Sequence, residues 1–162
     1  MNDIYKSPEA NLEQVNPTAD LDNFERFTAW AVFGLSFITV GIYYMYWIYT
    51  RSRKLNEFHE NKISDVLMKS TVALYIPYMA SSFFPESFYE NSSFVLVFVL
   101  VALAYLILYI VWIFTFRSRL LAIARANGHP EFRLNPALVF FFQSWYLQYK
   151  INSYIDKKRI VV

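Results

Sequence analysis

The sequence predicts an all-α integral membrane protein, with three transmembrane helices and a short C-terminal re-entrant or interfacial helix. Three observations lead to this prediction. Of the 162 residues, 56% are hydrophobic and only 17% are charged, whereas a soluble domain has about 25% charged residues. The hydrophobic residues form long uncharged runs that a soluble domain of this size could not bury. The basic residues flank these runs and do not interrupt them.

The composition also excludes several classes of protein. The chain has no cysteine, which excludes iron–sulfur clusters, zinc ribbons and thiol chemistry. Its formal net charge of +2 is too small to indicate nucleic-acid binding. Residues 1–22 are polar and lack apolar periodicity, so we expect a flexible tail there. A membrane domain at 23–155 and a basic C-terminal end at 156–162 are expected to follow.

Two uncharged runs are long enough to cross a bilayer as helices. Residues 27–50 would form about 36 Å of helix and residues 94–116 a similar length, against a hydrocarbon core of about 30 Å. Aromatic residues crowd the end of the first run just before Arg51, as is usual at a membrane interface. The weak point of the first run is Thr39-Val40-Gly41, where a helix could bend or break.

Two further apolar runs are shorter. Residues 66–85 contain Pro77 and predict a kinked second span. Residues 134–149 include Gln143 and Gln148, and this run fits a re-entrant or interfacial helix better than a span.

The basic residues predict the orientation, because basic loops resist translocation. The linker 51–69 carries five lysines and arginines and the chain from Arg117 onward carries eight, whereas the 86–93 turn carries none. We therefore expect the linker and the C-terminus in the cytoplasm and the turn outside. If 27–50 crosses as one helix, which the charge count favours, the N-terminal tail lies outside. If the chain reverses at Thr39-Val40-Gly41, the tail stays inside.

The segment Thr39-Val40-Gly41-Ile42-Tyr43-Tyr44-Met45-Tyr46-Trp47 resembles the T-x-G-I-Y-x-x-Y-W signature of a bacterial integral-membrane family known only as a domain of unknown function. Leu55-Asn56 and Leu147-Gln148-Tyr149-Lys150-Ile151-Asn152 resemble further short motifs of that family. The resemblance extends over residues 27–152. It implies a multi-pass protein of the bacterial inner membrane and brings no catalytic residues. The residues matching the family motifs are Thr39, Gly41, Ile42, Tyr43, Tyr46, Trp47, Asn56, Gln148 and Asn152.

No catalytic constellation stands out in the sequence. His59 and His129 lie on the same predicted side of the membrane as several acidic residues, but no spacing typical of metal ligands is present. The predicted spans contain no Asp, Glu, Arg or His, and their single lysine, Lys69, lies near one end of the second span, which argues against a proton or ion pathway. We therefore expect no catalytic residues, no metal and no cofactor.

These observations predict a non-enzymatic small multi-pass membrane protein. We expect an accessory or scaffold subunit that binds anionic lipid and another membrane protein or a second copy of itself. The alternatives are an oligomeric transporter or channel, and a membrane enzyme that uses His59 and His129. Basic residues next to the runs are expected to contact lipid headgroups; they are Arg51, Arg53, Lys54, Arg117, Arg119, Lys150, Lys157, Lys158 and Arg159.

Overall fold

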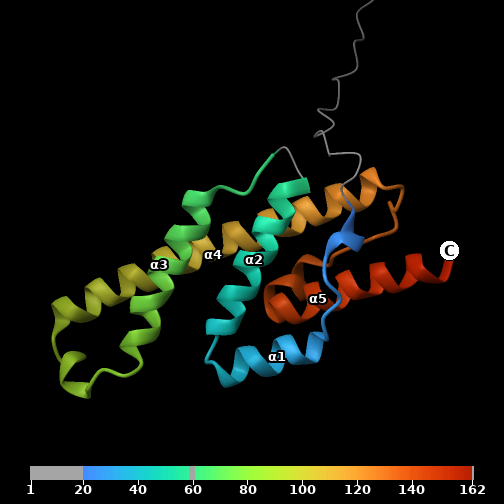
Figure 1. The fold of residues 1–162 in the computed structure, drawn as a ribbon. Helices are drawn as coiled ribbons and strands as arrows, with labels where there is room; N and C mark the ends of the chain where they lie inside the picture. Colours follow the sequence, from blue (N-terminus) through green and yellow to red (C-terminus); the bar gives the residue numbers. More distant parts are fainter. Residues whose placement is uncertain (1–19, 59–60, 162) are drawn as a thin grey trace, which may run out of the picture.

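The computed structural model describes the backbone of residues 20–58 and 61–161 and their side chains through residue 158. In this part of the chain all the regular secondary structure is helical, which confirms the all-α class (Figure 1). The elements are η1 (Leu21–Asn23), α1 (Ala29–Ile38), α2 (Ile42–Phe58), α3 (Asp65–Ser81), η2 (Glu86–Phe88), α4 (Ser92–Ala126) and α5 (Pro136–Val161); η1 and η2 are short 3-10 helices.

A sharp turn at residues 39–41 separates α1 from α2, and the two helices run in different directions (Figure 1). Val40 and Gly41 both have positive φ angles, of 51° and 88°. The hydroxyl of Thr39 accepts a hydrogen bond from the Tyr43 amide at 2.9 Å and so partners a donor in the first turn of α2. The prediction of one continuous helix over 27–50 is therefore wrong, because this turn divides the uncharged run into two helices.

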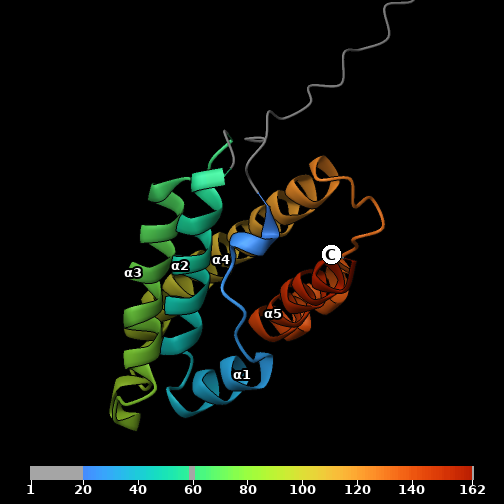
Figure 2. The ribbon, with the colours of Figure 1, turned by 45° about the vertical axis from the view of Figure 1, so that its right-hand side comes forward.

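A second change of direction interrupts α5 at Gln143, which has a φ of 41° and a ψ of −121°. The Asn135 amide donates a hydrogen bond to the Tyr146 hydroxyl at 3.2 Å, although an unbroken helix would separate these residues by about 16 Å. The structure thus replaces the predicted short helix at 134–149 by two arms, 136–142 and 144–161 (Figure 2). The second arm includes most of the predicted basic end at 156–162.

The α3 helix and the first half of α4 form a hairpin, whereas the second half of α4 belongs to the core of the molecule (Figure 1). Within the described residues, α4 alone is long and apolar enough to cross a membrane. This agrees with the span predicted at 94–116, and α4 continues beyond it to Ala126. The α3 helix has 17 residues with Pro77 inside it, so it is shorter than the predicted span at 66–85.

The buried core lies where α2, the second half of α4, α5 and η1 meet. Trp112, Phe116 and Leu120 of α4 are completely buried there, against Ile48 of α2 and Leu147 of α5. The first half of α4 is different, because most of its large apolar side chains are exposed. The core therefore fixes the end of the molecule that carries most of the basic residues.

Candidate functional site

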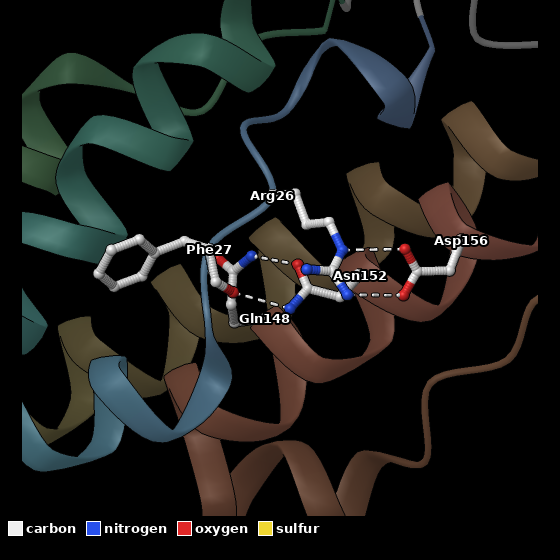
Figure 3. Close-up of polar contacts among 5 residues, drawn as sticks. All are labelled: Arg26, Phe27, Gln148, Asn152 and Asp156. Atoms are coloured by element: carbon white, nitrogen blue, oxygen red, sulfur yellow. Dashed lines mark hydrogen bonds and ion pairs between the residues drawn. The ribbon is translucent and has the colours of Figure 1, made fainter. Parts of the chain in front are cut away.

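A line of hydrogen bonds joins α2, α5 and the segment before α1. Trp47 Nε1 donates to Gln148 Oε1 at 3.0 Å, and Gln148 Nε2 donates to Asn152 Oδ1 at 2.8 Å. Asn152 Nδ2 then donates to the carbonyl of Phe27 at 2.7 Å (Figure 3). We call these three side chains and the Phe27 carbonyl the polar seam. Three motif residues that are far apart in sequence therefore meet in one place.

The polar seam fixes the entry of the chain into α1. Gln148 is completely buried and Trp47 is 3% exposed, so losing the hydrogen bond between these two side chains would leave buried polar atoms without water as a substitute. Trp47 comes from α2, Gln148 and Asn152 come from the second arm of α5, and the Phe27 carbonyl lies just before α1. The seam therefore holds both interrupted helices in place.

Ion pairs beside the polar seam connect the segment before α1 to the C-terminal end of α5. Arg26 binds both carboxylate oxygens of Asp156, at 2.9 and 3.2 Å (Figure 3). Lys158 pairs with Asp20 and also with Asp22, at 2.8 Å from the latter. Burial raises the pKa of Asp20, but the hydrogen bond and charge of Lys158 outweigh it, so this pKa lies below its ordinary value.

The turn at residues 39–41 is fixed by a tyrosine from α3. The Tyr75 hydroxyl donates a hydrogen bond to the Val40 carbonyl at 2.7 Å. A Cβ atom on Gly41 would lie 2.5 Å from this hydroxyl oxygen, in a backbone conformation with φ of +88°. Only glycine fits both the close contact and the positive φ without strain. The Thr39 and Gly41 positions of the motif therefore have a structural explanation.

Among the other motif residues, Asn56 has a role in packing within the chain, whereas Ile42 and Tyr46 are exposed. Asn56 clamps the linker, since its side-chain amide donates to the Ile63 carbonyl at 2.9 Å and its Oδ1 accepts from the Ile63 amide at 2.8 Å. Ile42 and Tyr46 are more than 60% exposed on α2. Packing within the chain does not explain these two residues, and both line a groove toward α3.

Several of the predicted headgroup residues are engaged inside the protein. Arg117 donates twice to the Leu134 carbonyl, at 2.9 and 2.6 Å, and so holds the loop before α5. Arg51 plays the same part before α1, because it donates to the Glu25 carbonyl at 3.0 Å. Because the guanidinium donors are charged, these charge-assisted hydrogen bonds are stronger than hydrogen bonds between neutral groups. Sequence reasoning assigned both arginines to lipid and missed these backbone contacts.

The remaining predicted headgroup residues differ in their surroundings. Lys54 pairs with a carboxylate of its own helix at 3.2 Å, and Lys150 lies over an aromatic ring. Arg119 is partly buried and has a partner within the protein. In the part of the chain that the structure describes, Arg53 and Lys157 are exposed and have neither an ion pair nor a hydrogen bond. The side chain of Arg159 lies outside the described residues.

Of the two histidines in the enzyme alternative, the structure describes His129. His129 Nδ1 lies 3.0 Å from a carboxylate oxygen of Glu131, and its ring packs edge-on against Tyr154. His59 lies outside the described residues. Among residues 20–58 and 61–161, no group of three or more potential ligands could hold a metal ion.

Two concave surfaces adjoin these contacts. A groove of about 810 Å³ lies between α1 and α5, and its lining includes the aromatic Trp30 and Trp145 and the charged Asp156 and Lys157. A cleft of about 380 Å³ lies between residues 23–27 and α2. Both combine aromatic and charged walls, so they suit amphipathic molecules better than small polar substrates.

One comparison with known proteins covers a large part of the residues described above. A family model described as a domain of unknown function (DUF4234) matches residues 27–122, which is more than half of the chain. The match includes the turn at 39–41, Trp47 and Asn56, and it ends before the two polar-seam residues of α5. Neither the curated proteins nor the solved structures contain a match. On the strength of the family match, the chain belongs to the DUF4234 family.

Proposed function

We propose that this chain is a non-enzymatic multi-pass protein of the bacterial inner membrane. It acts as an accessory or scaffold subunit that binds anionic lipid and another membrane protein or a second copy of itself. The observation that supports this most directly is the uncovered apolar surface of α4. Leu96, Val97, Leu100, Leu103 and Ile107 are each at least 49% exposed, and a surface of this kind fits lipid or a membrane partner.

The proposed topology follows from the contacts of the segment before α1. Arg26 and Asp20 pair with the C-terminal end of α5, and Arg51 binds the Glu25 carbonyl. The N-terminal segment therefore belongs with the basic, cytoplasmic end, and the chain reverses at residues 39–41. In this topology α3 and α4 cross the bilayer, whereas α1–α2 and the first arm of α5 enter it from the cytoplasmic side and return.

The lengths of the helices fit this topology. The 17 residues of α3 give about 25 Å of helix, which is somewhat short for a hydrocarbon core of about 30 Å. The α3–α4 connection adds an aromatic cluster in which the Phe84 and Phe88 rings stack at 5.2 Å and both contact Phe94. Aromatic clusters of this kind are typical of membrane interfaces.

Native mass spectrometry of the full chain, purified in a mild detergent, tests the proposed function. We expect a stoichiometric protein partner or a second copy, together with retained anionic phospholipid. A monomer without partner and without lipid would contradict the proposal. A matched preparation of a variant with Leu100 and Ile107 replaced by serine tests the α4 surface, and we expect it to lose the protein partner but to keep the lipid.

A second candidate is an oligomeric transporter or channel, because two interrupted helices are joined across the polar seam. Transporters build substrate sites from interrupted helices of this kind. The uncharged runs still lack ionisable residues, which makes coupling to protons or ions difficult. Flux into liposomes that contain the purified protein tests this candidate, and inert liposomes would exclude it.

A further inference from the structure

The groove between α2 and α3 has a volume of about 680 Å³ and is almost entirely apolar. Its α2 wall includes the exposed motif residues Ile42 and Tyr46, and its α3 wall includes Ala73. Along α3 the groove extends from Lys69 to Met79, which is a rise of about 15 Å. That length is one half of a hydrocarbon core of about 30 Å. The groove is therefore as deep as one leaflet of a bilayer.

Two basic residues lie at the end of this groove that is nearest to the cytoplasmic side. Lys69 lines the groove itself. Arg53 follows the groove residue Tyr49 by one helical turn and so extends the same face of α2. Both side chains are exposed, and within the described residues neither has an ion pair or a hydrogen bond. The apolar groove thus ends at two basic residues, Arg53 and Lys69, which we call the cationic mouth of the groove.

The acidic residues nearby do not neutralise this mouth. Glu57 lies one turn beyond Arg53, but it pairs with Lys54 at 3.2 Å. Asp65 lies one turn before Lys69 on α3, and no ion pair joins the two in the structure. Counted over the described residues, the mouth carries the cations of Arg53 and Lys69 and the carboxylate of Asp65, which leaves a net positive charge.

We propose that this groove is a specific site for one anionic diacyl phospholipid of the cytoplasmic leaflet. One acyl chain lies along the groove between α2 and α3, and the phosphate lies between Arg53 and Lys69. Arginine and lysine form strong charge-assisted hydrogen bonds with phosphate oxygens, and the apolar walls match an acyl chain. The inference rests on the proposed function, because it takes the basic end of the molecule as the cytoplasmic side.

Native mass spectrometry with defined lipids tests this site. The purified full chain is mixed with phosphatidylglycerol or with phosphatidylcholine of the same acyl chains, and the fraction that retains one lipid is measured. We expect phosphatidylglycerol to be preferred, and the R53Q/K69Q variant to lose about fivefold in affinity for each cation removed. The control is the R125Q/R133Q variant, which removes two exposed cations away from the groove and is expected to keep the preference.

A third variant tests the groove apart from its charge. Ala73→Phe fills the groove, so we expect weaker retention of both lipids. If R53Q/K69Q and R125Q/R133Q lose the preference equally, the site is excluded, although the proposed binding of anionic lipid stands. If wild-type protein shows no preference for phosphatidylglycerol, both proposals fail. A dimer that Ala73→Phe dissociates would show that a second copy occupies the groove, which also overturns the site.

Discussion

The α3–α4 hairpin and the interrupted helices are held together by different forces. In the hairpin, aromatic rings stack between the two helices; Tyr78 of α3 stacks on Tyr105 at 5.2 Å and on Phe98 at 6.3 Å. Around α1, α2 and α5, side chains such as Asn152 and Arg117 bind backbone carbonyls of the connecting segments. Continuous helices satisfy most of their own backbone groups, whereas interrupted helices leave polar groups that must find partners inside a membrane.

The largest expected effect is at the turn between α1 and α2. Gly41→Ala introduces both a clash with the Tyr75 hydroxyl and a side chain at φ of +88°. Gly128 has a φ of +79° but open space around it, so Gly128→Ala isolates the conformational cost. We expect a loss of about 3 kcal/mol for Gly41→Ala and about 1 kcal/mol for Gly128→Ala.

Thermal unfolding in one detergent compares these glycine variants directly. Tyr75→Phe removes the hydroxyl oxygen that clashes, so the Gly41→Ala/Tyr75→Phe double variant should be less damaged than the sum of its single changes. Equal destabilisation by Gly41→Ala and Gly128→Ala would show that Tyr75 does not fix the turn.

The next effect concerns the polar seam. Gln148→Leu removes the acceptor of Trp47 Nε1 and the donor to Asn152, both at a buried position. We expect a loss of about 2 kcal/mol from the unpaired buried groups. Tyr78→Phe is the matched change in the hairpin, where the ring stacking stays, and we expect almost no change. The same unfolding measurement applies, and similar losses from both variants would remove the contrast between the two regions.

A smaller effect is expected at the loop before α5. Arg117→Lys keeps the charge but loses the double hydrogen bond to the Leu134 carbonyl, because lysine lacks the planar guanidinium. We expect faster proteolysis within residues 127–135 and a loss of about 1 kcal/mol. Arg125→Lys at the end of α4 is the control. If both variants are cleaved at the same rate, Arg117 does not hold this loop.

The smallest effect is the pH dependence of the Asp20–Lys158 pair. The pKa of Asp20 is lower in the folded protein than its ordinary value of 3.8. Its contribution to stability is therefore fully present above pH 3.8 and is lost as the pH falls through the folded-state pKa. Asp20→Asn should remove this part of the acid destabilisation, measured by unfolding at a series of acidic pH values. An unchanged acid profile would show that the pair is not coupled to folding.

The sequence predicted α4 well because its hydrophobic run is long and has no turn residues inside it. By hydropathy alone, residues 27–50 form a run as continuous as that of α4. Only Thr39-Val40-Gly41 indicates the turn that the structure contains. No glycine or proline near Gln143 predicts the change of direction there. A hydrogen bond from the Asn135 amide to the Tyr146 hydroxyl accompanies it, and local sequence does not predict such a contact.

The sequence likewise predicted only part of the candidate site. The family resemblance selected Trp47, Gln148 and Asn152, but it did not indicate that they bind one another. The polar seam joins residues 101 positions apart in sequence, so local patterns could not reveal it. Arg51 and Arg117 were interpreted from their position beside hydrophobic runs, because charge patterns do not distinguish a lipid headgroup from a backbone carbonyl.

In the proposed topology the chain reverses at residues 39–41, so that the residues before α1 lie on the same side of the membrane as the C-terminus. Single cysteines test it directly, because the chain has none of its own. Glu25→Cys, Glu90→Cys and Lys157→Cys are exposed positions before α1, in the α3–α4 connection and near the C-terminus. With a membrane-impermeant maleimide, we predict labelling at position 90 in intact cells, and at positions 25 and 157 only after permeabilisation. Labelling at both 25 and 90 in intact cells would contradict the reversal, because it would place the residues before α1 outside.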